Sequence, residues 1–569
     1  MKLFKRFYCA LLVCAPIIAI LALAARATTS AAEPNNPVFA TVTIASLDDL
    51  QTAVSKVAEK LERQDMANVI FELARSQKYV ALLDPEKPIT IAFATNGDTV
   101  APFVRVPLTD FEPDALDALK GLLEDRLDEF ELELRVSDAG LYVGQKALMD
   151  FILSIPEEKL NIAPSAVSER APLFAFDLNL TNAPEEILEA GASALRLKLA
   201  EGLSELEDDE QINQLDQIFD YLFDVFECVE TMRVAFTIDE SCAFVATFAA
   251  SVKEGSFLAD ELERSQQTPT RWSALTSLPN SIYGTISTGV VSERDKELTK
   301  NAYAGLPELW DSLDELDVIV DDPENYELAK ELLELLQKSA EKDGELDVND
   351  SGLAILARPA AIIAGSVEAS TEELREALGR IAARLQAENA KFNDFIALDA
   401  EKIDDFDVSK ITIPMSEFCD LGNYADKSIA IRAAFAKDAV VLAIALADQE
   451  GKELDDLLAQ VLAATKSPAP QPTDSILDLS QLAVLAQDIL TSLSDEIELT
   501  DEAIATLKCV SENHDAKIVF SSQYADNLLK MQMTASGSIV DSIKAIVDNI
   551  EEAKLEDSGQ DVDDLFDEE

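Results

Sequence analysis

A strand–turn–strand–helix pattern, clearest at residues 428–462, limits what this chain can fold into more than any other feature. Large apolar residues alternate with small or polar ones from Ile429 to Phe435. Alternation resumes from Val440 to Leu446 after a turn, and the spacing of leucines then changes to that of a helix. Alternation predicts strands, the tight turn makes them antiparallel, and the i, i+3, i+4, i+7 spacing predicts a helix packed on them.

The same order recurs along the chain, with single strand–helix units between several of the copies. The further copies lie at 89–123, 232–263, 353–385 and 516–550. Their uneven spacing argues against a regular solenoid. We therefore expect an α+β fold, with antiparallel sheets built from recurring βα and ββα units and helices packed on one face. Because one face of strand 439–447 is mostly alanine, we also expect both of its faces to be buried, with Ala443 and Ala445 against a neighbouring element.

Composition shifts and proline-rich connectors predict the domain organisation. The boundaries are a signal peptide at 1–32, an N-terminal α+β half at 38–268, a second α+β half at 278–466, a final α+β unit at 467–553 that packs with the second half, and a disordered acidic tail at 554–569. A chain of 569 residues, 48% of them apolar, can build several cores of this kind.

The N-terminus has the pattern of an export signal. A basic start at residues 2–6 precedes an apolar run from Phe7 to Ala24, and small residues follow. Cleavage after Ala32 fits this pattern, with Ala27 as the alternative site. An uncleaved membrane anchor stays open, because the run is just long enough to span a bilayer. We expect a periplasmic or extracellular protein, with no integral membrane segment in the mature chain.

The formal net charge of −62 limits the partners of the protein. A field of this sign repels nucleic acid and anionic lipid surfaces, so we expect no nucleic-acid partner. The acidic residues are scattered along predicted helices, which is typical of a solvated surface. Weak, non-specific cation binding is compatible with that surface, and protein or envelope partners remain unknown.

Residues for catalysis or metal binding are scarce. His514 is the single histidine and lies in a polar loop, and no nucleophile elbow, phosphate-binding loop or dinucleotide fingerprint occurs. A segment starting at Asp347 begins like a calcium loop, but Arg358 stands where a bidentate glutamate is needed. Residues 349–352 are better explained as a hairpin turn. We therefore predict no catalytic, cofactor-binding or metal-ligating residues and no cofactor.

Four cysteines remain after export, which is few for a secreted chain of this length. Cys228 and Cys242 do not face each other in the predicted hairpin, which argues against a bridge between them. Whether Cys419 and Cys509, or any other cysteines, form a disulfide cannot be decided from the sequence.

The order of several segments resembles that of large secreted proteins of unknown function from planctomycete-type bacteria. The segments are VTIASLDDL, ITIAFATNGDTVAPFVRVPL, LRVSDAGLYVGQKALM, APLFAFDLNLTNAP, VAFTIDESCAFVATFAA and GLAILARPAAIIAGSVEA. The resemblance covers most of residues 40–550 as pattern and order. It implies an exported, uncharacterised α+β protein and carries no activity or catalytic residues with it.

These observations favour a non-enzymatic exported protein that acts through its surfaces as an envelope or extracellular structural or binding protein. Apolar residues along the predicted sheet faces motivate one alternative, a carrier of an apolar ligand in a sheet–helix groove. A carboxylate-based hydrolase is the other alternative. Only Trp272 and Trp310 could offer a tryptophan ring to a carbohydrate, and the many carboxylates single out no pair.

Overall fold

A computed structural model describes residues 36–558, except 77–79, 98, 110–126, 128–130, 138–139, 161, 163–171, 185–223, 294–295, 297–329, 332–333, 336, 340, 389, 416–426, 448–450, 469–473, 493–500 and 514. The chain divides into two compact units. Unit 1 consists of Met1–Ile212, Ile218–Asp260 and Ser522–Asp548, and unit 2 of Asn213–Gln217, Glu261–Ser521 and Asn549–Glu569. Each unit combines helices with a large antiparallel sheet, which confirms the predicted α+β class.

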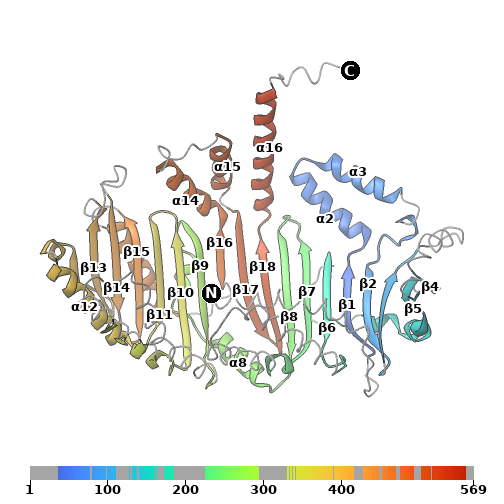
Figure 1. The fold of residues 1–569 in the computed structure, drawn as a ribbon, viewed down its shortest axis with the longest axis horizontal. Coiled ribbons are helices and arrows are strands. Elements are labelled where there is room, and N and C mark those ends of the chain that lie inside the picture. Colours follow the sequence, from blue (N-terminus) through green and yellow to red (C-terminus); the bar gives the residue numbers. More distant parts are fainter. Residues whose placement is uncertain are drawn as a thin grey trace. The chain divides into compact units, whose positions relative to one another are not determined.

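The sheet of unit 1 has the strand order β4-β5-β3-β2-β1-β6-β7-β8-β18, and every neighbouring pair is antiparallel (Figure 1). The strands are β1 (Val38–Ile44), β2 (Ile89–Thr95), β3 (Val100–Val106), β4 (Leu132–Ser137), β5 (Gly140–Gln145), β6 (Phe174–Asn179), β7 (Val229–Ile238), β8 (Phe244–Val252) and β18 (Leu528–Ala535). The strand β18 comes from the far end of the sequence and pairs with β8 along its whole length. This arrangement differs from the sequence prediction, which placed all of 467–553 with the second half.

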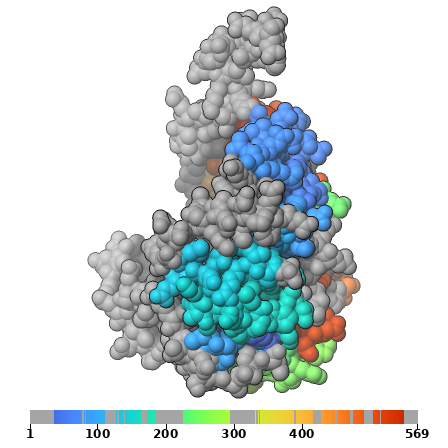
Figure 2. All heavy atoms as spheres, turned by 90° about the vertical axis from the view of Figure 1, so that its right-hand side faces the viewer, coloured from blue at the N-terminus to red at the C-terminus, as the bar shows by residue number. Residues whose placement is uncertain are grey.

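The helical elements that begin in unit 1 are α2 (Leu47–Lys60), α3 (Gln64–Arg75), η1 (Val80–Leu82), η2 (Lys146–Leu148), α5 (Met149–Ser154), η3 (Glu157–Leu160), α8 (Phe257–Gln267) and α16 (Ser538–Ser558). The start of α2 follows from its sequence, because the Ser46 side chain accepts a hydrogen bond from the backbone N–H of Asp49 and donates one to its carboxylate. Figure 2 shows the surface of unit 1 where α2 and α3 (blue) and the segment from β4 to η3 (cyan) are exposed.

The sheet of unit 2 has the strand order β12-β13-β14-β15-β11-β10-β9-β16-β17, again antiparallel throughout. The strands are β9 (Ser281–Val290), β10 (Val348–Leu356), β11 (Ala360–Val367), β12 (Ile396–Ile403), β13 (Phe406–Pro414), β14 (Ser428–Phe435), β15 (Ala439–Ala447), β16 (Ser475–Asp478) and β17 (Lys517–Ala525). The helical elements are η4 (Ser273–Thr276), α12 (Thr371–Glu388), η5 (Ala390–Asp394), α13 (Lys452–Ala464), α14 (Leu479–Ser492) and α15 (Asp501–Glu512).

The alanine face of β15 is covered, as the sequence predicts. Ala443 and Ala445 are 0% and 3% exposed, and they belong to one core with the buried leucines of α13. The opposite face of the same strand is open, because Leu442 and Ile444 are each more than two-fifths exposed. The prediction that both faces are buried is therefore wrong. Small side chains let α13 approach one face, whereas nothing in their pattern requires a cover on the other.

Two helices of unit 2, α12 and α13, lie on opposite faces of its sheet. The core under α13 includes Ala430 of β14, whereas the core beside α12 includes Ile431 of the same strand. Successive residues of a strand point to opposite faces, so the two helices cannot share one. The prediction of helices on one face does not hold in this unit.

A fully buried tryptophan anchors the covered face of unit 2. Trp272 packs over Gly352 and Gly365, where an added Cβ at Gly365 would meet the indole ring at 2.5 Å. Asp350 fixes the ring by accepting hydrogen bonds from the Thr270 hydroxyl and from the backbone N–H of residue 271, while its carbonyl accepts one from the indole N–H. Glycine is required at residue 365 because the ring occupies the space of a side chain, and at residue 352 because an added Cβ would lie 2.7 Å from Leu275 Cδ1.

Candidate functional site

The clearest candidate for binding is a row of apolar side chains that crosses the sheet of unit 2. Residues directly opposite one another in neighbouring strands point to the same face, so a chain of such pairs forms a continuous surface. The pairs run in order through Ile518, Leu477, Tyr283, Ile355, Ile362, Ile444, Ile431, Ile411 and Ile396. We call this set the apolar row of unit 2.

The middle of the apolar row is exposed, whereas its β12 end is covered. Ile396 and Ile411 are buried in the core that α12 shares with β12 and β13. On β11 and β15, Ile362 is 48% exposed and Ile444 41% exposed, and Leu442 beside the row is 42% exposed. Fully burying a side chain of this size contributes about 1.5–3 kcal/mol, so each of the three retains roughly 1 kcal/mol of unused apolar burial.

The sheet of unit 1 has an apolar row of its own. In order across the strands it contains Leu134, Val143, Val104, Ile91, Val42, Phe176, Val234, Phe248 and Met531. The neighbouring row on this face carries phenylalanines in ring contact, with centroids 6.1 Å apart for Phe174 and Phe236 and 5.9 Å apart for Phe236 and Phe244. Most of the members of this row are half-buried, and the face is richer in aromatic rings than that of unit 2.

A second apolar surface of unit 1 lies on the helix α3. Met66, Val69, Ile70 and Leu73 follow one another at helical spacing, and each is 58–65% exposed. The helix packs through Ala67, which is buried, so its large apolar residues point away from that contact. Single exposed apolar residues are normal in proteins, but four on one helix face mark an interaction surface.

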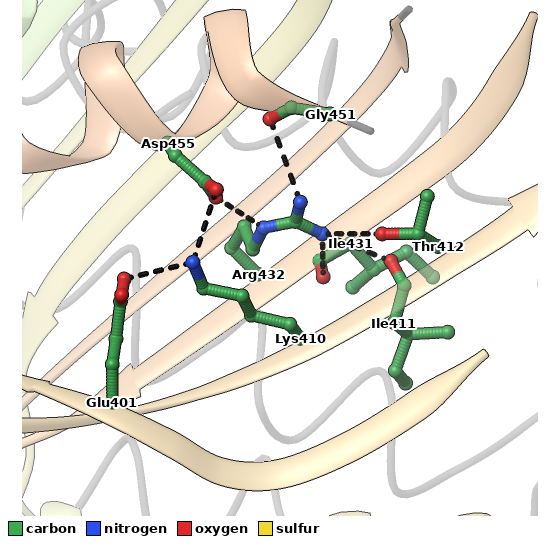
Figure 3. Close-up of polar contacts among 8 residues, drawn as sticks. All are labelled: Glu401, Lys410, Ile411, Thr412, Ile431, Arg432, Gly451 and Asp455. Atoms are coloured by element: carbon green, nitrogen blue, oxygen red, sulfur yellow. Dashed lines mark hydrogen bonds and ion pairs between the residues drawn. The ribbon is translucent and has the colours of Figure 1, made fainter. Parts of the chain in front are cut away.

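A charged cluster with a fully buried arginine lies beneath the start of α13 (Figure 3). Arg432 is 1% exposed, and its guanidinium donates to Asp455 Oδ1 at 2.5 Å, to the Ile411 carbonyl at 3.0 Å and to the Thr412 hydroxyl at 3.1 Å. Lys410 joins the cluster through an ion pair with the Asp455 carboxylate at 3.0 Å.

This arrangement holds α13 on the sheet. Asp455 lies in the first turn of α13, where a negative charge is favourable beside the unpaired N–H groups of the helix. The start of the helix is fixed by Gly451, whose φ of 66° is left-handed and whose added Cβ would lie 2.5 Å from the guanidinium of Arg432. The contacts of this cluster compensate for the burial of the Arg432 charge, and its charged groups hold α13 against the sheet.

A pair of carboxyl groups lies before the helix α12. Glu368 and Asp343 are hydrogen-bonded through their side chains. Burial, and to a smaller extent this hydrogen bond, raises the pKa of Glu368 to about 8. Asp343 also accepts hydrogen bonds from the backbone N–H of Ala369 at 2.7 Å and from the Ser370 hydroxyl at 2.8 Å. Carboxyl groups in direct contact leave no room for a glycosidic bond, since such catalytic pairs stand about 5 Å or more apart. The pair fits a structural role at the helix start.

A buried ion pair lies within the sheet of unit 1. Asp177 of β6 faces Arg233 of β7 directly across the strands, with Arg233 Nε 3.6 Å from Asp177 Oδ1. Burial raises the pKa of Asp177 to about 6, and the guanidinium opposes that rise. Both side chains lie on the face that carries the core with α5, opposite to the apolar row of unit 1. The pair is therefore separated from the exposed apolar surface.

The structure describes several of the residues that the sequence analysis considered as sites. Trp272 is buried and offers no ring to a carbohydrate, and residues 349–352 lie within the strand β10, so the predicted hairpin turn there is wrong. Among the described residues, no cluster of histidine, cysteine, aspartate and glutamate is arranged to hold a metal ion. Cys228 and Cys242 are buried free thiols.

Other predictions fall on residues that the structure does not describe. These are the cleavage site at Ala32, the acidic tail, His514, Trp310 and Cys419, so a bridge from Cys419 to Cys509 stays open. Within the described part of the chain, no helix is both long and apolar enough to cross a membrane.

No protein-family model, curated protein or solved structure matches this chain. The assignment of a site therefore depends on the arrangement of its own residues. The alternating apolar pattern in the sequence indicated several of the strands that carry the row of unit 2, such as those within 353–367 and 429–447, but not β12 and β13. It could not indicate the row itself, because Ile362 and Ile444 meet only through the pairing of two separate hairpins.

Proposed function

We propose that the protein is an exported, non-enzymatic binding protein of the envelope or the extracellular space, and that it works through the uncovered apolar face of its sheet. The observation that carries this proposal is the exposed centre of the apolar row of unit 2, at Ile362, Ile444 and the adjacent Leu442. Contiguous exposed apolar surface in a protein marks a site that is covered in use. The exposed stripe of α3 supports the same kind of role.

A binding role without catalysis is consistent with how the ionisable groups are used. Arg432, Asp455 and Lys410 are engaged in holding a helix, and Asp343 is engaged by a helix start. Groups that serve as general acid or base need access to a substrate in a pocket. In this proposal the acidic residues form a solvated surface, which disfavours nucleic acid and binds cations weakly.

The proposal extends to the organisation of the chain. The hairpin of β14 and β15 followed by α13 supports a repeating ββα building block, and recurring βα and ββα units would supply strands for each sheet. A building block that recurs in this way produces wide sheets with extended faces, which suits binding by a surface better than catalysis in a single cleft.

Nile red, a neutral dye that fluoresces in apolar surroundings, tests the binding face. The protein should enhance its fluorescence, and Leu442→Gln should reduce the enhancement, whereas Leu398→Gln should leave it unchanged. Leu398 is the matched control, because it lies on β12 and is also 42% exposed. Equal enhancement in the two variants would contradict the proposed face. Turnover of an esterase, glycosidase or peptidase substrate that is lost on changing one carboxylate would contradict the absence of catalysis.

Expression with its own leader in a Gram-negative host tests export. The secreted or periplasmic product should begin at Glu33 by N-terminal sequencing, because cleavage is expected after Ala32. Retention of the intact leader in the membrane fraction would contradict cleavage and would indicate a protein anchored by its N-terminus.

A further inference from the structure

The exposed part of the apolar row of unit 2 is purely aliphatic. Ile355, Ile362 and Ile444 are neighbours across β10, β11 and β15, and Leu442 and Leu446 flank them on β15. None of these side chains carries a hydrogen-bond donor or acceptor. A ligand that lies here meets hydrocarbon alone and gains nothing from polar groups along its length.

The backbone beneath this patch is already in use. The strand β11 pairs with β10 on one side and β15 on the other, and β15 also pairs with β14. An extended peptide therefore cannot add to the sheet as a further strand, since this requires a free edge. Laid flat on the patch, a peptide would lose water from its own N–H and C=O groups without replacement.

The composition and size of the patch also argue against a folded partner. Protein interfaces are enriched in aromatic residues and arginine, and stable ones bury about 800 Å² on each side. The exposed side chains at the centre are Ile362, Ile444 and Leu442, at 41–48% exposure each. This is enough for a narrow ligand and too little for a stable protein interface.

The covered end of the row shows what kind of surface packs there. In the core beside α12, Leu378 and Leu385 pack with Ile396, Ile411 and Ile431, so aliphatic groups cover the row at that end. The remaining length from Ile431 on β14 to Tyr283 on β9 comprises four strand spacings, or about 19 Å at 4.8 Å each. One leaflet of a bilayer core, the length of one lipid chain, is about 15 Å.

We propose that unit 2 binds one long aliphatic chain, laid across β10, β11 and β15 along the apolar row with one end against the elements that carry the α12 core. This inference rests on the proposed function and names the chemical class of its ligand. The row recognises the chain and not its head group. Because the protein carries a net charge of −62, a chain with a neutral head binds better than one with an anionic head.

Competition against cis-parinaric acid, an unbranched polyene fatty acid whose fluorescence rises in apolar surroundings, tests the inference on the full mature chain. The wild-type protein should enhance the probe fluorescence, and hexadecanol should displace it, whereas hexanol at the same concentration should not. Hexadecanol should displace the probe at lower concentration than palmitic acid, and the difference should shrink in 0.5 M salt.

Two variants test where on unit 2 the ligand binds. The double variant Ile362→Gln and Ile444→Gln should weaken probe binding at least tenfold, and Leu398→Gln should change it less than twofold. Both substituted isoleucines are exposed, so the fold should survive, and circular dichroism checks this. The chain-length series on the wild type gives a test that does not depend on any variant.

Displacement by hexanol and hexadecanol at equal concentration, or probe binding unchanged in the double variant, would overturn the inference. If Nile red still binds in a Leu442-dependent way, the proposed function stands and only the aliphatic-chain ligand is lost. If neither probe binds the wild type, both proposals fail.

Discussion

Replacing Glu368 with glutamine should stabilise unit 2 at neutral and alkaline pH. In the folded protein the pKa of Glu368 is raised from 4.5 to about 8 by burial and by its hydrogen bond with Asp343. The folded state therefore holds a proton that the unfolded chain has released. The stability that this proton confers is complete below pH 4.5 and is lost as the pH rises towards 8.

The structure also sets the size of the effect. A shift of this extent corresponds to about 5 kcal/mol for a wholly shielded carboxyl group. Because Glu368 is partly exposed to solvent, we reduce this to about 2 kcal/mol. Glutamine preserves the contacts without the charge, since its amide can donate to Asp343 while its oxygen accepts from the Ser366 hydroxyl, which now donates to Glu368.

Urea denaturation followed by tryptophan fluorescence measures the difference, because Trp272 is buried in the same unit. From pH 5.5 to 8 the wild type should lose on the order of 1 to 2 kcal/mol relative to Glu368→Gln. The control Glu376→Gln removes one exposed charge from the same region of the chain and should follow the wild type. A Glu368→Gln variant with the pH slope of the wild type, or one that is less stable at pH 8, would refute the reasoning.

Two further substitutions test the packing of unit 2. Gly365→Ala places a Cβ 2.5 Å from the Trp272 ring, so it should lower the free energy of unfolding by about 2 kcal/mol in thermal denaturation and shift the tryptophan emission. The control Gly379→Ala has no atom within 4 Å of the added Cβ and should be neutral or stabilising by up to about 1 kcal/mol. Asp455→Ala leaves the Arg432 charge buried without its carboxylate and should cost about 3 kcal/mol in urea unfolding, and a loss below about 1 kcal/mol would show that water or another acid replaces it.

Local features of the fold were predictable because they depend on near neighbours in the chain. The alternation from Ile429 to Leu446 predicts two strands, and the structure has β14 and β15 there in an antiparallel pair. The Ser46 cap of α2 is likewise visible in the sequence. The hairpin turn predicted at residues 349–352 also depended on near neighbours alone, and it is wrong for that reason. These turn-forming residues lie within the strand β10, whose pairing with β9 the sequence does not reveal.

The candidate binding face was predictable only in part. Apolar alternation showed that one side of β15 is large and the other small, and the small side is indeed covered by α13. It did not show that Ile444 pairs with Ile362, or that α12 covers the row over β12 and β13 and stops before β15. Identical alternation serves a buried face and an exposed one, so exposure had to come from the structure.

The sequence by itself determined many of the strands, several of their hairpins, the high negative charge and the small and large faces of β15. These follow from backbone periodicity and from charges that any fold must leave in water. Only the tertiary structure decided the order of the strands, the separation of α12 and α13 to opposite faces, and the exposed centre of the apolar row. Those features depend on which distant segments bury one another's surfaces best, and that competition is settled by packing in three dimensions.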